Sequence, residues 1–230
     1  MKEAVFSSPL FGISISIIAY YIGVVLNKKT KIALVNPLLI SYVIIISFLK
    51  VFNIPLEWYL NGGDFINLFL TPATAVLALT IYRQRKLIKE NFLTIALATF
   101  VGAITSIVSV LALCKLFSLS DPITYSLLPK SITTPMAIAV SSSIGGIESI
   151  TVLAVIITGV TGNILAPVLI KLLKVKDPIT QGVAIGTCSH AVGTSKAVEL
   201  GDVQGAVSSV ALTFTGIITV VLSLIIFNFI

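Results

Sequence analysis

Two short polar segments carry the residue types in this chain that can bind an anion or hold a proton. They are Leu128-Pro-Lys-Ser-Ile-Thr-Thr-Pro135 and Gly186-Thr-Cys-Ser-His-Ala-Val-Gly-Thr-Ser195, and each interrupts an otherwise apolar stretch. Hydrocarbon offers no partner to a backbone broken by proline or glycine, nor to a lysine or histidine side chain. Such segments persist at membrane depth only where protein buries them or where they line a wet cavity, so they form the candidate site.

Lys130 is the residue of the first segment best suited to bind a carboxylate. An ammonium group inside a membrane is costly, by at least a few kcal/mol, and usually serves a function. The alternative is a lysine whose long stem carries its charge to the membrane surface. Further candidate ligands are the hydroxyls of Ser131, Thr133 and Thr134. These hydroxyls either bind the anion or satisfy backbone groups, and Thr134 suits the N-cap of a helix that begins at Pro135.

His190 is the only histidine of the chain and lies in the second segment. Its unperturbed pKa of about 6.5 allows it to bind an anion or to couple transport to a proton; the alternative is a structural, hydrogen-bonded histidine. Gly186 and Gly193 are expected to loosen this segment. The remaining candidate ligands are Ser189, Gly193, Thr194 and Ser195. No Cys, Asp or Glu stands at ligand spacing beside His190, so we expect neither a metal site nor a cofactor.

The composition predicts an all-α polytopic membrane protein, with 1–230 as a single membrane domain. Hydrophobic residues make up 57% of the chain and charged residues 10%, against about 25% charged residues in soluble domains. A membrane-spanning helix needs about 20 apolar residues. Six charge-free runs approach or exceed that length: Ala4–Asn27, Ile32–Leu49, Phe65–Tyr82, Asn91–Cys114, Ser149–Ile170 and Val203–Ile230. We therefore expect about six full transmembrane helices plus two broken or re-entrant segments.

The net charge of +6 is distributed as in a multi-pass protein of a cell membrane. The basic residues cluster in short loops, at Lys28–Lys31, Arg83–Lys89 and Lys171–Lys176. Positively charged loops of membrane proteins face the cytoplasm. We therefore expect a lipid bilayer around the chain and no nucleic acid partner. Outside these loops, Lys196 and Glu199 are expected to form an exposed pair and Asn163 to serve helix packing, while Cys114 and Cys188 are expected to be free, buried thiols.

An internal duplication is visible in glycines and in one tetrapeptide. Gly102, Gly159 and Gly216 are spaced by 57 residues, and Asp121-Pro-Ile-Thr124 recurs as Asp177-Pro-Ile-Thr180. These matches predict a weak first repeat at 64–120, a second at 121–176 and a third at 177–230. The last two repeats are inverted if Pro122–Gly146 enters and leaves the membrane on one side, and parallel if it crosses. Inversion places the lysines after Ile170 in the cytoplasm, so the charges favour it.

Several motifs in order resemble those of the LrgB/CidB family. They are Pro129-Lys-Ser-Ile-Thr-Thr-Pro-Met-Ala-Ile-Ala139, Ile144-Gly-Gly146, Thr158-Gly-Val-Thr-Gly162 and Gly186-Thr-Cys-Ser-His-Ala-Val-Gly-Thr-Ser-Lys-Ala197. The resemblance implies a membrane protein described as antiholin-like or holin-like, with a plastid relative that translocates glycolate and glycerate and bacterial relatives linked to pyruvate uptake. It also implies a small LrgA/CidA-type membrane protein as a candidate partner, and leaves independent action open.

The amino-acid sequence leaves two functions open. The first is a secondary transporter, proton-coupled through His190, for small monocarboxylates such as pyruvate, glycolate or glycerate. The second is a holin-like or antiholin-like effector that assembles laterally, as a homo-oligomer, and modulates murein hydrolase activity and lysis. Transport needs a charged site inside each subunit, as Lys130 provides, so the residues favour the transporter. We do not expect an enzyme, because no acidic residue stands near Ser189 and His190 to orient the ring.

Overall fold

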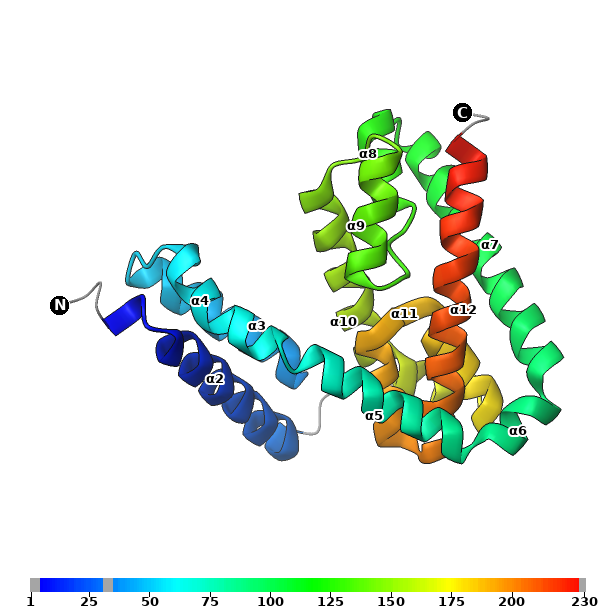
Figure 1. Cartoon of the computed structure of the whole chain (residues 1–230), viewed down its shortest axis with the longest axis horizontal. Helices are drawn as coiled ribbons and strands as arrows, with labels where there is room; N and C mark the ends of the chain where they lie inside the picture. Colours follow the sequence, from blue (N-terminus) through cyan, green and yellow to red (C-terminus); the bar gives the residue numbers. More distant parts are fainter. Residues whose placement is uncertain (1–4, 31–34, 228–230) are drawn as a thin grey trace. The chain divides into compact units, whose positions relative to one another are not determined.

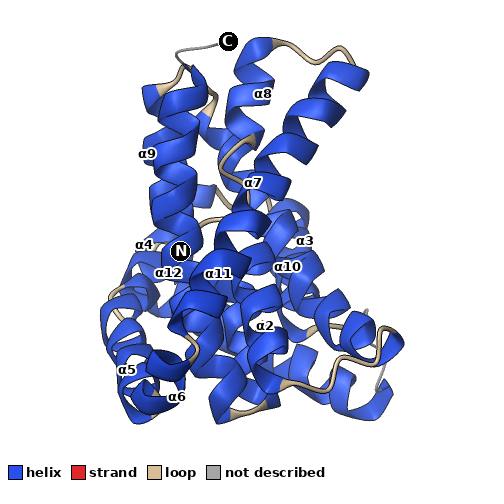
Figure 2. Ribbon diagram, turned by 90° about the vertical axis from the view of Figure 1, so that its right-hand side faces the viewer, coloured by secondary structure: helices blue, strands red, loops and turns tan. Residues whose placement is uncertain are grey.

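The computed structural model describes residues 5–30 and 35–227 as helices and short connections, with no strand among them (Figures 1 and 2). A few side chains between 70 and 80 and those of 226–227 are not described, and Lys31 and the end of the third predicted repeat lie outside the described residues. The helices are α2 (Pro9–Thr30), α3 (Pro37–Val51), α4 (Leu56–Asn67), α5 (Leu70–Arg83), α6 (Arg85–Glu90), α7 (Phe92–Leu116), α8 (Asp121–Leu127), α9 (Thr134–Ser143), α10 (Glu148–Leu172), α11 (Pro178–Leu200) and α12 (Asp202–Phe227). The all-α class is confirmed.

Four described helices are long and apolar enough to cross a bilayer: α2, α7, α10 and α12. Their 22 to 26 residues correspond to about 33–39 Å at 1.5 Å per residue, against a hydrocarbon core of about 30 Å. The other two charge-free runs give shorter helices than expected. The run Ile32–Leu49 is shortened because Pro37 starts α3 and the side chain of Asn36 caps it, accepting from the Leu38 amide at 2.9 Å. The run Phe65–Tyr82 is divided by a turn at Leu68 and Phe69 between α4 and α5.

The chain divides into two compact units, Met1–Val76 and Leu77–Ile230. In the first unit, α2 and α4 approach so closely that a Cβ added at Gly12 would lie 2.9 Å from the Gly62 Cα. Small residues let membrane helices pack backbone to backbone in this way. The hydroxyls of Ser16 and Tyr59 form a hydrogen bond of 3.0 Å across the same contact. The candidate site lies wholly in the second unit.

Residues 121–146 form a re-entrant hairpin, which we call the first hairpin. Its two arms are α8 and α9, and its tip is the irregular segment 128–133. The chain returns to the side from which it came, because the Ile147 amide donates to the Ser126 hydroxyl in α8 at 2.7 Å. The tip packs on α10, where Ile132 and Ala137 form a buried cluster with Val155. Pro122–Gly146 therefore enters and leaves on one side.

Residues 178–200 form the second hairpin, which is α11 broken in its middle. Ser189 and His190 leave the helical region, with φ/ψ of −133°/15° and 41°/−144°. Both arms lie beside the first turns of α12. Gln204 of α12 donates to the Gln181 side chain in the first arm at 3.0 Å, and a Cβ added at Gly205 would lie 2.8 Å from Val198 in the second arm.

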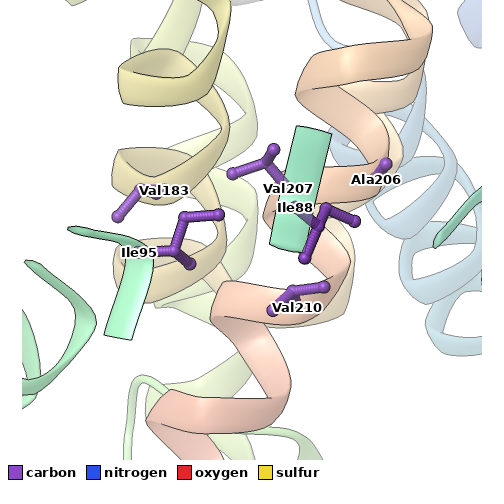
Figure 3. Close-up of a cluster of buried hydrophobic side chains, with 6 residues drawn as sticks. All are labelled: Ile88, Ile95, Val183, Ala206, Val207 and Val210. Atoms are coloured by element: carbon purple, nitrogen blue, oxygen red, sulfur yellow. The ribbon is translucent and has the colours of Figure 1, made fainter. Parts of the chain in front are cut away.

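The two hairpins enter the second unit from opposite sides. In Figure 2, α8 lies at one end and α6 at the other. Figure 3 shows buried side chains that join α6 and the start of α7 to the first arm of the second hairpin and to α12: Ile88, Ile95, Val183, Ala206, Val207 and Val210. We call this side, which also holds Lys171 and Lys174 at the end of α10, the basic end. The arrangement is the inverted one of the two alternatives, whereas the repeat boundaries stay a prediction.

The three equally spaced glycines each meet a residue from a hairpin. A Cβ added at Gly102 would lie 2.6 Å from Thr187 Cγ2, one at Gly159 2.5 Å from His190 Cε1, and one at Gly216 2.8 Å from Met136 Cε. Such distances are shorter than van der Waals contact, so a side chain at Gly102 or Gly159 would displace Thr187 or His190, whereas at Gly216 the flexible end of Met136 would have to move. The 57-residue spacing thus reflects one recurring task, which is to let a hairpin residue approach the middle of a long helix.

Candidate functional site

A cavity of about 520 Å³ lies between α10 and the first arm of the second hairpin, and the tip of the first hairpin contributes to it. Its lining residues are Lys130, Ile157, Thr158, Thr161, Gly162, Leu165, Ala166, Leu169, Ile170, Leu173, Val175, Thr180, Gln181, Ala184, Ile185, Cys188 and Ser189. Lys130 is the one charged side chain in this lining. The cavity is therefore apolar along its walls and cationic at the point where the hairpins meet.

Lys130 is half-buried at the tip of the first hairpin. Its Nζ donates to the Ser131 hydroxyl at 3.4 Å. Among the described residues, one ion pair is present, and it joins Lys196 to Glu199 at 2.6 Å. Lys130 is therefore not paired with a carboxylate of those residues. An ammonium in apolar surroundings without a counter-ion favours an anionic ligand, because that ligand would supply the missing charge. The expected exposed pair Lys196–Glu199 is confirmed.

The hydroxyls of the first hairpin lie around Lys130 but outside the cavity. Ser131 is buried, and its hydroxyl forms a hydrogen bond of 2.9 Å with Ser106 of α7. Thr133 is the N-cap residue of α9, and Thr134 is its first residue. The N-cap is therefore Thr133 and not Thr134, one residue earlier than expected, and the side chain of Thr133 makes no capping hydrogen bond. Ser131 therefore holds the tip against α7 and positions Lys130.

Ser189 is the predicted ligand of the second hairpin that lines the cavity. It is buried and packs against Gly162 of α10 and Gly193 of its own hairpin, because a Cβ added at either glycine would meet the Ser189 side chain. Gly193 thus makes room for Ser189. The chain breaks at Ser189 and His190 and stays helical at Gly186 and Gly193, contrary to the expectation that the glycines would loosen it. At Gly186, a Cβ would lie 2.9 Å from Ser208 Cα, so this glycine serves close packing on α12.

His190 is buried beside the cavity and does not line it. Its Nε2 lies 2.8 Å from the Val155 carbonyl oxygen of α10. A carbonyl only accepts, so Nε2 carries the hydrogen and Nδ1 is the nitrogen left to take a proton. The φ of 41° is in the left-handed region, which a non-glycine residue occupies only when its surroundings hold it there. The bond to Val155 and the space at Gly159 supply that restraint.

Thr194 and Ser195 hold the second arm in place. The Thr194 hydroxyl donates to the His190 carbonyl at 2.9 Å and pairs with Ser208 of α12 at 2.9 Å. Ser195 is exposed, and its hydroxyl donates to the Val192 carbonyl at 2.7 Å. Asn163 of α10 donates to that same carbonyl at 2.8 Å, which confirms its packing role. Of the nine predicted site residues, Lys130 and Ser189 line the cavity, and the others support the two tips.

Sequence reasoning missed several cavity residues on α10 and α11. Thr158, Thr161 and Gly162 belong to a motif that was visible in the sequence, but no charge or proline marked them as lining a site. Cys188 is a correction, because it was expected to be buried like Cys114, whereas it is exposed and lines the cavity beside Lys130. The period of the α11 helix places it on the same face as Ala184 and Gln181.

Two half-helices begin at the hairpin tips. They are α9, after Thr133, and the second arm of α11, after His190. The N-terminus of a helix carries unpaired amides and a partial positive charge, so both ends favour an anion at the tips. The fold and site together define a class: a polytopic membrane protein in which two opposed re-entrant hairpins bring one lysine to a cavity.

Comparison with known proteins gives the family. Residues 16–229 match the model of the LrgB-like family, and the chain belongs to that family. It is 41% identical over 215 residues to an antiholin-like protein LrgB of Bacillus mycoides (strain KBAB4), covering 93% of this chain and 94% of the relative. The same values hold for an antiholin-like protein LrgB of Bacillus cereus (strain B4264). No solved structure matches the chain.

Proposed function

We propose that this protein is a secondary transporter of small monocarboxylates of the pyruvate, glycolate or glycerate type. The observation that carries the proposal is the position of Lys130, the one charged side chain of a cavity that lies along α10 and the first arm of α11 and that reaches the tips of two opposed hairpins. Opposed broken segments that meet inside a membrane domain are the usual geometry of a transporter site, with half-helix N-termini aimed at the anion. A lysine placed at such a point is expected to serve binding.

In this proposal Lys130 binds the carboxylate, and Ser189 hydrogen-bonds the group on the neighbouring carbon. Both side chains line the same end of the cavity. Ser131 and Ser106 hold the lysine tip, and Gly162 and Gly193 let Ser189 reach the cavity. Protein hydroxyls and an ammonium replace the water that the anion loses on entry, which is the requirement for binding an ion in a poorly hydrated cavity.

His190 is the proposed coupling group. Its Nδ1 can take a proton while Nε2 keeps its bond to the Val155 carbonyl, so protonation adds a positive charge behind the cavity without breaking that bond. A monocarboxylate is an anion at neutral pH, and moving it inward against a negative potential costs about 2.3 kcal/mol per 100 mV. Carrying one proton with each anion removes that cost.

Uptake of labelled pyruvate and glycolate into liposomes containing the full chain alone tests the proposal. Lys130→Ala is expected to abolish uptake, and Lys130→Arg to restore only part of it because a planar guanidinium differs in shape and hydration from an ammonium. The matched control is Lys176→Ala, an exposed lysine at the basic end that does not line the cavity. Uptake by Lys130→Ala at the wild-type rate would overturn the proposal.

The pH dependence of uptake tests the coupling role by itself. Wild-type uptake is expected to rise as the pH falls through the range in which a histidine takes up a proton. His190→Gln keeps a side-chain amide that can donate to Val155 but cannot be protonated at these pH values, so it should bind substrate without this pH response. An unchanged pH profile in His190→Gln refutes proton coupling through His190 and leaves the anion site standing.

A second candidate function is an antiholin-like membrane effector, and the names of the two Bacillus relatives favour it. In that function the chain would modulate murein hydrolase activity in the cell membrane, as a homo-oligomer or beside a small LrgA/CidA-type protein. The two candidates differ in their need for Lys130. If lysis in a cell depends on this chain yet is the same with Lys130→Ala, the effector function acts without transport. If lysis and uptake are lost together, one anion flux underlies both.

A further inference from the structure

Thr158 and Thr161 of α10 differ from threonines elsewhere in the long helices in how their hydroxyls are bonded. Five threonines of α7, α10 and α12 donate to the carbonyl four residues earlier: Thr99, Thr105, Thr151, Thr213 and Thr215. Among the described residues, the Thr158 and Thr161 hydroxyls have no hydrogen-bond partner. Both line the cavity that holds Lys130, so both are available to a ligand in it.

Thr158 lies on α10 between the contacts of the two hairpin tips. Val155 packs on the tip of the first hairpin, and a Cβ added at Gly162 would meet Ser189 of the second. These two α10 positions are seven residues apart, which corresponds to about 10 Å of helix. Thr158 shares their face at spacings of three and four residues, and Thr161 follows it by three. The two threonines are therefore placed where the tips meet, next to the proposed ligands of the anion.

Contact with lipid does not account for these two hydroxyls. Thr105 is an exposed residue of the spanning helix α7, and its hydroxyl donates to the Val101 carbonyl at 2.8 Å. A threonine that faces lipid is expected to keep such a bond, because hydrocarbon offers no other partner. Thr161 is exposed as well, and Thr158 is half-buried, yet neither makes this bond. Thr105 is therefore a matched control of the same residue type outside the cavity.

We propose that Thr158 and Thr161 are specificity-determining residues that bind a hydroxyl on the third carbon of the substrate. This inference rests on the proposed function, in which Lys130 binds the carboxylate and Ser189 the group on the second carbon. Because Ser189 lies on α11, the third carbon of the same acid is next to α10. A hydroxyl there can donate to one threonine and accept from the other, whereas a methyl group can do neither. The site therefore prefers a 2,3-dihydroxy acid to an acid that ends in a methyl group.

Competition among small acids measures the selectivity. Glycerate, lactate of the same configuration at the second carbon, and pyruvate would compete with the uptake of labelled glycolate into liposomes containing the full chain. Glycerate and lactate differ only in the hydroxyl on the third carbon. Glycerate is expected to inhibit at a concentration at least fivefold lower, since fivefold corresponds to the net value of one neutral hydrogen bond, about 1 kcal/mol. Equal half-inhibiting concentrations of glycerate and lactate would overturn the proposal.

Valine variants test the two residues, because valine keeps the shape of threonine and lacks its hydroxyl. Thr158→Val and Thr161→Val should each weaken inhibition by glycerate about fivefold and change inhibition by lactate and pyruvate less than twofold. Thr158→Ser and Thr161→Ser keep a hydroxyl and should keep the preference for glycerate, as should the control Thr105→Val. Inhibition by glycerate that is unchanged in either valine variant, or that weakens equally with inhibition by lactate and pyruvate, would overturn the assignment.

Protection of Cys188 from a thiol reagent separates this inference from the proposed function. Cys188 is exposed and lines the same cavity, so a bound acid should slow its reaction whether or not the acid is transported. Half-protecting concentrations of glycerate and lactate are expected to differ at least fivefold, as in the uptake assay. If glycolate protects Cys188 in the wild type and not in Lys130→Ala, while glycerate and lactate protect equally, the anion site stands and the selectivity inference fails. If no acid protects Cys188 or enters the liposomes, the anion site itself fails.

Discussion

One added methyl group at Gly159 tests whether the centre of the site is built as described. A Cβ at this position would lie 2.5 Å from His190 Cε1, 2.6 Å from Nε2 and 2.9 Å from Val192 Cβ. The ring is held by the Val155 carbonyl at 2.8 Å, and the Val192 carbonyl is held by Asn163 at 2.8 Å, so neither neighbour can move freely. Overpacking of this kind costs about 1–3 kcal/mol.

The matched control is Gly63→Ala in α4, where the nearest atoms would be 3.9 and 4.0 Å away, an ordinary contact. Both glycines are helical, so both substitutions gain the same helix propensity, about 0.5–1 kcal/mol. The difference between the two variants therefore isolates overpacking. At about 2–4 °C per kcal/mol for a chain of this size, Gly159→Ala should melt about 2–12 °C below Gly63→Ala in detergent.

A double variant identifies the contact responsible. His190→Ala removes the ring that the new methyl group would meet, so Gly159→Ala should cost less stability in that background than alone. Residues in direct contact show interaction energies of about 0.5–3 kcal/mol in such cycles. Additive effects of the two substitutions, or equal melting temperatures for Gly159→Ala and Gly63→Ala, would refute the packing of His190 on α10.

Three further predictions concern topology, access and capping. Cysteines placed at Lys29, Lys86 and Lys174 should react with a membrane-impermeant reagent only from the cytoplasmic side; reaction at 174 from outside would contradict the inverted arrangement. Cys188 should react with a thiol reagent that enters from the basic end and be protected by substrate, whereas buried Cys114 should not react; protection that persists in Lys130→Ala would show that the anion does not bind there. Hydrogen bonds from the Thr180 hydroxyl and then from its amide lower the pKa of Asp177 from its ordinary value of 3.8. The ionised Asp177 cap therefore stabilises the fold above pH 3.8 and loses its effect as the pH falls through the lowered pKa of Asp177. Asp177→Ala should lower the free energy of unfolding by about 0.5–2 kcal/mol at pH 7 and should have no effect in strong acid. Thermal melts at both pH values would measure it, and a constant difference would contradict the cap.

The sequence by itself determined the class, the two interruptions and the cationic residue. These features follow from local rules: a bilayer demands long apolar helices, and Pro129, Pro135 and a lysine cannot lie in such a helix without a special environment. The 57-residue spacing of three glycines favoured an internal repeat, and the lysines after α10 favoured opposed hairpins. Each of these signals is carried by single residues and their spacing, so no tertiary structure was needed to detect them.

Only the tertiary structure decided which atoms face the cavity. The break in α11 falls at Ser189 and His190 rather than at a glycine, because the Val155 carbonyl and the space at Gly159 hold His190 in a conformation its own chemistry disfavours. Cys188 is exposed because it faces the cavity between α10 and α11. Burial and hydrogen-bond partners at these positions come from helices distant in sequence, and residue type alone does not encode which helix will be the neighbour.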